Sequence, residues 1–392
     1  MSSKVCVAGV GMIPFVKPGA NDPYPVMARN AAQQALDDAG IRYTAVQQSY
    51  AGYVYGDSTS GQKAVYQLGM TGIPVFNVNN NCSTGSTALF LARQAIECGA
   101  ADCVLALGFE QMKPGALDLV FTDRPSPFED FDRECDAFVG MAELPLALRY
   151  FGGAGQEHMR KYGTPLEAFA KIRAKASRHA ARNPLALLRR ELSVEDVMAA
   201  PVLWPGVMTR LMACPPTCGA AAAVLVSEEF ARRQGLRTDV RIAAQAMTTD
   251  QPDSADDMMN LVGYSMSQRA ARAVYEQAGI GPEDLDVVEL HDCFAHNELI
   301  SYEALGLCPE GGAAAFIDAG DNSYGGRIVT NPSGGLLSKG HPLGATGLAQ
   351  CYELSLQLRG QAEQRQVEGA RLALQHNLGL GGACVVTLYE RQ

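Results

Sequence analysis

The chain has 392 residues, too many for one ordinary core of roughly 100–200 residues, so we expect two or three packed domains. Hydrophobic residues make up 47% of the chain, charged residues 19% and aromatic residues 7%, and glycine and alanine are abundant. This composition favours close helix–sheet packing in a soluble α/β protein and excludes a disordered chain. The net charge of −10 excludes a general nucleic-acid binder, because neutralising phosphates needs a basic face.

Membrane, export and disulfide patterns are not evident in the sequence. Apolar runs stay below the roughly 18–20 residues that span a bilayer, the first residues lack a signal-peptide core, and the last four lack a Ser-Lys-Leu-type address. We therefore expect a cytoplasmic protein without a membrane span. The eleven cysteines are an odd number without a Cys-x-x-Cys pair, so we expect neither a disulfide framework nor a metal site.

Four segments of the first half recur in the same order in the second half. The first pair is helix-like and ends in Ala-Gly-Ile, the second opens a helix after a polar turn, and the last two are strand-like. The pairs are residues 31–41 with 270–280, 82–89 with 341–348, 105–107 with 372–374, and 219–224 with 381–386. The pattern predicts a duplicated chain, in which each half builds a mostly parallel sheet covered by helices.

An insertion separates the last two repeat segments of the first half. The offset between matched segments falls there from 267 to 162 residues, so the first half carries additional residues between Leu107 and Gly219. These residues are expected to form loops and helices. We predict an N-terminal half formed by residues 1–112 and 207–238, an inserted loop domain over residues 113–206, and a C-terminal half over residues 239–392.

Cys82 lies where open α/β sheets collect their chemistry, between a strand and a helix. It follows the strand-like residues 73–78 and three asparagines, and it precedes an apolar-periodic helix over residues 83–98. A thiol at a helix N-terminus is close to unpaired N–H groups and to the positive end of the helix dipole, which lowers its pKa and favours the thiolate. A buried, inert cysteine is the alternative interpretation.

The insertion carries a basic stretch from Arg160 to Arg190. Nine basic side chains and one acidic side chain give it a local excess of +8. Such an excess can attract a polyphosphate ligand. A solvated helical face is the alternative interpretation for most of these side chains.

Three turns of the second half carry reactive or glycine-rich sequence. His291 and Cys293 follow an apolar strand over residues 285–290, where buried polar groups need partners. His341 follows the glycine-rich residues 331–340 at the repeat position of Cys82, so a two-fold relation between the halves would pair a thiol with an imidazole. Glycines near Gly379 can present an oxyanion hole. A backbone-bonded histidine, a core cysteine and an ordinary glycine turn are the structural alternatives.

These motifs together resemble the thiolase superfamily, and within it the sterol-carrier-protein-type (SCP-x) thiolases. The likeness runs along nearly the whole chain, through residues 52–58, 77–82, 289–294, 338–342 and 375–379. It implies the thiolase fold of the α/β class, with two duplicated βαβαβαββ halves in a five-layer α-β-α-β-α arrangement and an inserted loop domain. It also implies an acyltransferase of fatty acid or sterol degradation, which cleaves branched-chain, sterol-derived or other bulky 3-ketoacyl-CoA with CoA by ping-pong transfer through a cysteine thioester.

The resemblance assigns three catalytic side chains. Cys82 is the acylated nucleophile, and His341 activates it. Most thiolases carry a second catalytic cysteine where this chain has Asn377, and the SCP-x type uses the cysteine of a His-Asp-Cys-Phe motif instead. Cys293 is therefore the expected acid/base.

The resemblance also implies oxyanion holes and a site for CoA. His291 is expected in the first oxyanion hole, and the backbone N–H groups of Cys82 and Gly379 in the second. CoA is implied as a co-substrate, without a permanently bound cofactor. The residues assigned to its binding are Ser333, Gly334, Arg160 and Lys161.

Two features of the chain depart from the family. Residues 214–219 read Cys-Pro-Pro-Thr-Cys-Gly where a Pro-Thr-Ser-Asp-Gly run is expected, and His296 replaces a small polar residue. The alternative functions are a Claisen-condensing acetyl-CoA acyltransferase, a thiolase-like retro-aldolase and a non-catalytic lipid-binding scaffold. Expected partners are acyl-CoA, CoA and further copies of the chain in a homodimer or homotetramer.

Overall fold

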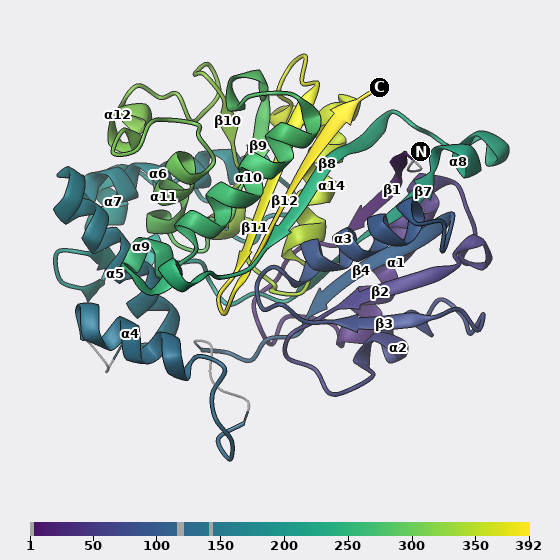
Figure 1. The fold of residues 1–392 in the computed structure, drawn as a ribbon, viewed down its shortest axis with the longest axis horizontal. Coiled ribbons are helices and arrows are strands. Elements are labelled where there is room, and N and C mark those ends of the chain that lie inside the picture. The colour runs from purple at the N-terminus through teal and green to yellow at the C-terminus, as the bar shows by residue number, and fades with distance from the viewer. Residues whose placement is uncertain (1–3, 116–120, 141–143) are drawn as a thin grey trace.

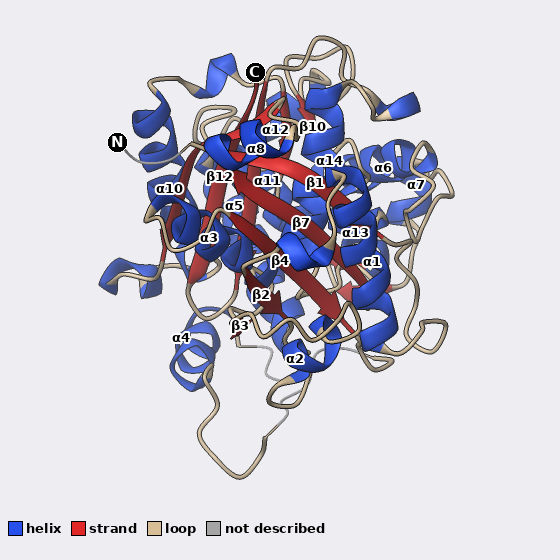
Figure 2. Ribbon diagram, turned by 90° about the vertical axis from the view of Figure 1, so that its right-hand side faces the viewer, coloured by secondary structure: helices blue, strands red, loops and turns tan. Residues whose placement is uncertain are grey.

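The computed structural model describes residues 4–115, 121–140 and 144–392. In this part of the chain, a ten-stranded mixed sheet runs through the molecule and helices pack against it (Figure 1). Figure 2 shows the strands inside and the helices around them. The predicted α/β class is confirmed.

The first half of the chain alternates strands with helices and ends in two strands. Its elements are β1 (Val5–Met12), α1 (Tyr24–Ala39), β2 (Gln48–Gly52), α2 (Ser60–Val65), β3 (Val75–Val78), α3 (Thr84–Glu97), β4 (Cys103–Glu110) and β7 (Gly219–Ser227). The strands lie in the order β3-β2-β4-β7-β1. β2 pairs parallel with β3 and β4, whereas β7 pairs antiparallel with β4 and β1.

The second half repeats this plan after one short helix, α8 (Glu228–Gln234), and has a further short helix, α9 (Met258–Leu261), between its first strand and its first long helix. Its strands are β8 (Val240–Thr248), β9 (Val287–Glu289), β10 (Val329–Thr330), β11 (Leu372–Gly379) and β12 (Ala383–Arg391). Its helices are α10 (Tyr264–Ala278), α11 (Ala295–Ala304), α12 (Ala313–Asp318), α13 (Gly335–Ser338) and α14 (Thr346–Arg359). The order is β10-β9-β11-β12-β8, with β9 parallel to β10 and β11, and β12 antiparallel to β11 and β8.

The predicted duplication is confirmed, because all four matched segments fall on equivalent elements. They lie in α1 and α10, at the starts of α3 and α14, in β4 and β11, and in β7 and β12. The expectation of a mostly parallel sheet is wrong, because the last strand of each half pairs antiparallel with both of its neighbours. β11 and β12 are joined by a tight turn at Gly381 and Gly382, and a hairpin can join only antiparallel strands.

The two halves meet in the middle of the molecule. One residue pair, Cys6 of β1 and Arg241 of β8, joins the two parts of the sheet edge to edge. α3 and α14 pack against each other between these parts, and Leu89 and Leu354 belong to one apolar cluster there. α1 covers the outer face of the first part and α10 that of the second. The layers therefore run α-β-α-β-α, as the resemblance implies.

The predicted insertion lies between β4 and β7, at the left and lower left of Figure 1. Its elements are α4 (Glu129–Val139), α5 (Leu146–Tyr162), α6 (Leu166–Ala181), α7 (Val194–Met198), β5 (Val202–Trp204) and β6 (Met208–Thr209). Phe151, Phe169 and Leu299 share one apolar cluster, so α5 and α6 pack on the second half. β5 and β6 form a short antiparallel pair on either side of residue 206. The predicted boundaries of the inserted domain stay a prediction.

Among the residues described, we find no helix that combines the length and the apolar character needed to cross a bilayer. The cytoplasmic location stays a prediction.

Candidate active site

Cys82 lies in the turn between β3 and α3, as the sequence predicts. Asn81 has a left-handed backbone, with φ of 51°. The N–H groups of Ser83 and Thr84 donate to the carbonyl oxygens of Asn80 and Asn81, both at 3.1 Å. Cys82 is only 7% exposed. A tight turn therefore fixes a buried thiol immediately before α3.

The N-termini of α3 and α14 meet face to face, as predicted, because glycines line their contact. A Cβ atom on Gly85 would lie 2.8 Å from the carbonyl oxygen of Gly344 and 3.0 Å from the nitrogen of Gly347. A Cβ atom on Gly344 would lie 2.5 Å from the carbonyl oxygen of Phe109. Glycine permits this close approach of two backbones, and the approach brings the two predicted reactive turns together.

His341 lies between α13 and α14, and its ring is held from one side. Its backbone N–H donates to Oγ1 of Thr217 at 3.1 Å, and its Nδ1 lies 2.7 Å from Oγ1 of Thr346. Nε2 is buried and has no hydrogen-bond partner among the described residues. Burial and the nearby Lys339 ammonium lower the pKa of His341 to about 3, so the imidazole is neutral.

His291 follows β9 and lies edge-on to His341, with ring centroids 5.1 Å apart and an interplanar angle of 81°. Its Nδ1 lies 3.0 Å from Nδ2 of Asn377. Its backbone N–H donates to Nδ1 of His376 at 3.4 Å. Burial, and then His341 and His376, lower the pKa of His291 well below its ordinary value. His291 is therefore a second neutral imidazole at this site.

Three of the predicted site residues converge. Sγ of Cys82, one ring nitrogen of His291 and one ring nitrogen of His341 all lie within 4.8 Å of one another, and all three residues are buried. A thiol beside a neutral imidazole can be activated as a nucleophile. One sulfur and two nitrogen ligands are also the donor types that bind zinc.

The protonation of Cys82 differs from the sequence expectation. The expected fall of the thiol pKa is wrong: burial, and then the charge of Glu110, raise the pKa of Cys82 to about 12. A helix terminus contributes about 0.3–1 kcal/mol to a nearby charge, whereas a rise from 9.0 to about 12 corresponds to about 4 kcal/mol against ionisation. Burial therefore outweighs the helix dipole, and the thiol needs a base.

Cys293 lies within electrostatic reach of Cys82, and so does Cys214, a thiol that the sequence reasoning did not select. Burial, and then Cys214 and Cys82, raise the pKa of Cys293 well above its ordinary value. The backbone N–H of Cys214 donates to the carbonyl oxygen of Cys293 at 2.9 Å. The unusual Cys-Pro-Pro-Thr-Cys run directly before β7 was the sequence feature that pointed to this loop. Cys214 and Cys293 therefore lie near Cys82, although neither belongs to the cluster that Cys82 forms with His291 and His341.

Glu110, at the end of β4, is a second residue that the sequence reasoning missed. Its buried carboxylate accepts hydrogen bonds from the N–H groups of Val54 at 3.1 Å, Tyr55 at 2.9 Å and Gly344 at 2.9 Å. Burial raises its pKa to about 7, against these hydrogen bonds. A lone acid at the end of an otherwise apolar strand could have indicated it. Glu110 links the first half to the turn before α14.

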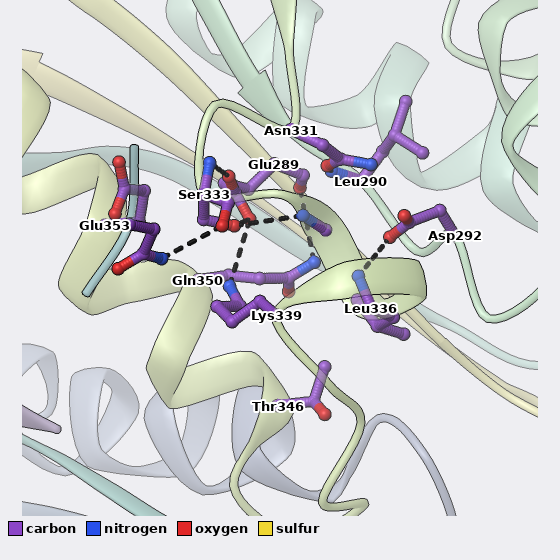
Figure 3. Close-up of polar contacts among 12 residues, drawn as sticks. Glu289, Leu290, Asp292, Asn331, Ser333, Leu336, Lys339, Thr346, Gln350 and Glu353 are labelled. Carbon is purple, nitrogen blue, oxygen red and sulfur yellow. Dashed lines mark hydrogen bonds and ion pairs between the residues drawn. The ribbon is translucent and has the colours of Figure 1, made fainter. Parts of the chain in front are cut away.

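Buried polar contacts tie the turn after β9 to the loop that leads to α14 (Figure 3). Glu289 accepts hydrogen bonds from the N–H and hydroxyl of Ser333 at 3.0 and 2.8 Å, and Nζ of Lys339 lies 3.3 Å from it. Asp292 accepts a hydrogen bond from the N–H of Leu336 at 2.7 Å. Because Asp292 stands between the predicted histidine and the predicted acid/base cysteine, these contacts hold both of them in place.

Ser333 and Gly334, assigned to CoA binding, lie in this buried frame. The hydroxyl of Ser333 donates to Glu289, and Ser333 is fully buried. Gly334 has φ of 95°, and a Cβ atom on it would lie 2.5 Å from Cβ of Ala180 in α6. Both residues therefore have structural contacts here, and their role in CoA binding stays a prediction.

The basic stretch divides into buried and exposed side chains. Arg173 donates to Oγ of Ser338 at 2.6 Å, and Lys175 forms a buried ion pair with Glu298. Arg160, assigned to CoA, has a side chain that is 79% exposed. Lys161, also assigned to CoA, pairs with Glu310 at 3.1 Å. The buried members anchor α6 to the second half, and the CoA role of the other two stays a prediction.

Gly379 ends β11 beside the Cys82 turn. A Cβ atom on it would lie 2.3 Å from the carbonyl oxygen of Asn80 and 3.1 Å from the backbone nitrogen of Ser83. A larger residue in place of Gly379 would therefore displace the turn that carries Cys82. Its assignment to an oxyanion hole stays a prediction.

Comparison with known proteins identifies the family of the chain. The family models described as "Thiolase, N-terminal domain" and "Thiolase C-terminal domain-like" match residues 5–143 and 246–389. Sterol carrier protein 2 of Oryctolagus cuniculus is 57% identical over 396 residues, which cover 99% of this chain and 72% of that protein.

Two solved structures share the fold at low sequence identity. The Ltp2-ChsH2(DUF35) aldolase matches with a TM-score of 0.81 at 22% identity, covering 99% of this chain and 98% of that chain. Human mitochondrial 3-ketoacyl-CoA thiolase in complex with CoA matches with a TM-score of 0.73 at 19% identity, covering 100% and 98%. By its family models and by a relative that matches 99% of its length, the chain belongs to the thiolase family and, within it, to the sterol-carrier-protein type.

Proposed function

We propose that this protein applies the thiolase-type acyl-CoA activity of its family to cleave 3-ketoacyl-CoA with CoA, through a thioester on Cys82. The observation that carries the proposal is the convergence of the Cys82 sulfur with ring nitrogens of His291 and His341 within 4.8 Å. A nucleophile with a raised pKa, a neutral base and a second imidazole, all buried and close together, suit covalent acyl transfer.

In the first half-reaction, Nε2 of His341 takes the proton of Cys82, and the thiolate attacks the 3-keto carbon. The bond between the α and β carbons breaks, and its electron pair moves to the α carbon. The Cys293 thiol protonates this carbon, so a short acyl-CoA leaves. The other acyl group remains as a thioester on Cys82, and Cys293 is left as a thiolate.

In the second half-reaction, the Cys293 thiolate takes the proton of an incoming CoA thiol. The CoA sulfur attacks the thioester carbonyl, and Cys82 leaves as a thiolate, which the protonated His341 then neutralises. Each half-reaction develops negative charge on a substrate oxygen. His291, and the N–H groups of Cys82 and Gly379, are the proposed donors to these oxygens, and such donors are most effective where water is excluded.

We propose branched-chain, sterol-derived or other bulky acyl groups as substrates, and the similarity of 99% of this chain to a protein named sterol carrier protein 2 supports this proposal. For CoA, the similarity to a thiolase solved with CoA supports a co-substrate role. The residues proposed to contact it remain Arg160, Lys161, Ser333 and Gly334.

We propose a homodimer or homotetramer that uses the free edge of β3. β3 is the outermost strand at its end of the described sheet, and Phe76 on it is 44% exposed. Tyr66 and Met70 are also exposed in the segment between α2 and β3. An unpaired edge strand beside exposed apolar side chains is typical of a surface that pairs with another chain.

Mass spectrometry of the intact protein after incubation with a 3-ketoacyl-CoA tests the proposal. We expect an added acyl group on the wild type and none on Cys82→Ala. Cys98→Ala is the matched control, because Cys98 is an exposed thiol at the other end of α3. It should be acylated like the wild type. A wild type that stays unmodified would reject covalent transfer and favour a retro-aldolase or a lipid-binding scaffold. A wild type that is acylated but catalyses condensation and not cleavage would favour the Claisen direction.

A further inference from the structure

Asn377 occupies the position where the resemblance places a second catalytic cysteine, and its side chain is fully buried between Cys82 and His291. We infer that Asn377 is a positioning residue, which fixes the ring nitrogen of His291 that carries the proton. The inference rests on the proposed function, because it concerns the donor to the substrate oxygen.

Backbone carbonyl groups determine the orientation of the Asn377 amide. Its Nδ2 lies 3.1 Å from the carbonyl oxygen of Cys82, which can only accept a hydrogen bond. Its Oδ1 lies 2.8 Å from Oγ of Ser86. Nε2 of Gln375 donates to Oγ of Ser86 and to the carbonyl oxygen of Gly347, both at 2.7 Å. Ser86 therefore accepts from Gln375 and donates its own proton to Asn377.

This orientation determines the tautomer of His291. One hydrogen of the Asn377 amide points to the Cys82 carbonyl, and the other points to Nδ1 of His291, 3.0 Å away. Nδ1 must then accept, so the single proton of the neutral ring is on Nε2. The N–H that the oxyanion hole requires is present only in this tautomer.

His341 has the opposite tautomer for a parallel reason. The hydroxyl of Thr346 donates to the carbonyl oxygen of Pro342 at 3.1 Å, so its oxygen accepts from Nδ1 of His341 at 2.7 Å. The lone pair of His341 is then on Nε2, which is the unpartnered nitrogen. Thr346 thus prepares one imidazole as a base, and Asn377 prepares the other as a hydrogen-bond donor.

Nitrogen-15 NMR of the full-length protein, labelled at its six histidines, tests the tautomer directly. Signals missing from a His291→Gln sample identify His291. We expect a protonated Nε2 and an unprotonated Nδ1 for His291 in the wild type. A proton on Nδ1 would overturn the inference, and this readout is independent of any acyl transfer.

Asn377→Asp keeps the shape of the side chain but turns the donor toward His291 into an acceptor. We expect a proton on Nδ1 of His291, and kcat/KM lower by about 10²-fold with KM little changed, because an oxyanion donor acts mainly in the transition state. A purely structural role predicts that this isosteric change is milder than Asn377→Ala, whereas the positioning role predicts that it is at least as severe.

Asn260→Asp is the matched control. The Asn260 side-chain oxygen accepts a hydrogen bond from the N–H of Ser265 at 3.2 Å, which a carboxylate preserves, so its kcat/KM should equal that of the wild type. An Asn377→Asp protein that keeps the wild-type tautomer or kcat/KM would overturn the inference. If that variant does not fold, the wild-type spectrum still decides. If no thioester forms on Cys82 of the wild type, by contrast, the proposed function is rejected, and the assignment of the His291 tautomer is unaffected.

Discussion

The turn before α3 and the turn before α14 stand at equivalent places in the two halves, yet they carry different chemistry. The first presents the thiol of Cys82, and the second presents the imidazole of His341. The second strands differ too: β9 leads into His291 and Cys293, whereas β2 ends at Gly52, where a Cβ atom would lie 2.7 Å from Thr84. The duplication thus supplies a geometry in which two turns meet, and divergence of the side chains makes one asymmetric site there.

The two turns agree in one respect, which is that burial keeps both groups neutral. It raises the pKa of Cys82 to about 12 and lowers that of His341 to about 3. The pair is therefore not a preformed thiolate and imidazolium. Activation has to occur by proton transfer when substrate binds, and the following variants test each side of this arrangement.

Removal of the imidazole from the second turn should have the largest effect. In His341→Ala, the thiol loses its base, so we expect acylation of Cys82 to slow by about 10²–10⁴-fold. Rapid-quench measurement of the first-product burst checks this expectation. A burst of wild-type rate would show that another group accepts the proton.

Removal of the thiol that follows β9 should separate the two half-reactions. We expect Cys293→Ala to become acylated on Cys82 but to turn over about 10²-fold or more slowly, because the acid/base for the substrate carbon and for CoA is missing. Mass spectrometry of the accumulated thioester and steady-state rates give the two readouts. Cys308→Ala removes a buried thiol elsewhere in the second half and serves as control. Wild-type turnover of Cys293→Ala would reject the assignment.

Glu110, which joins the first half to Gly344, should give a pH-dependent effect on stability. Its pKa is about 7 in the folded protein against an ordinary 4.5, so the carboxyl favours folding below pH 4.5 and this contribution is lost as the pH rises to about 7. The unfolding free energy of the wild type relative to Glu110→Gln should fall by up to about 3 kcal/mol over this interval. Urea unfolding across the interval measures it, and a constant difference would contradict the raised pKa.

Widening of the contact between the two turns should have the smallest effect. Gly344→Ala places a methyl group against the backbone of Phe109 and Gly52, which we expect to cost about 1–3 kcal/mol of stability and to slow acylation. Gly360→Ala, at the other end of α14, meets no atom within 4 Å. It should lower stability through its left-handed backbone alone and leave the acylation rate unchanged, so equal acylation rates in the two variants would contradict a role for the contact.

The repeat pattern predicted the duplication and the approach of Cys82 to His341, because both follow from matched segments along the chain. It did not indicate Glu110, whose partner Gly344 is 234 positions away and becomes adjacent only in the folded sheet. The raised pKa of Cys82 could not be predicted from the local sequence either. The residues around Cys82 indicate the start of a helix, but they do not indicate how deeply the thiol is buried. The sequence placed Lys175 in a basic stretch, but it did not show that Lys175 is buried in the fold, where it forms an ion pair with Glu298.

The proton that Asn377 holds on His291 also affects which ions the pocket can capture. Cys82, His291 and His341 offer the sulfur and nitrogen donors of a zinc site, but a metal ion needs a lone pair on each imidazole that binds it. The only lone pair of neutral His291 faces the amide of Asn377. Binding of zinc by all three residues would require His291 either to give up the hydrogen bond from Asn377 or to move its proton from Nε2 to Nδ1, so the inferred tautomer disfavours a three-residue zinc site.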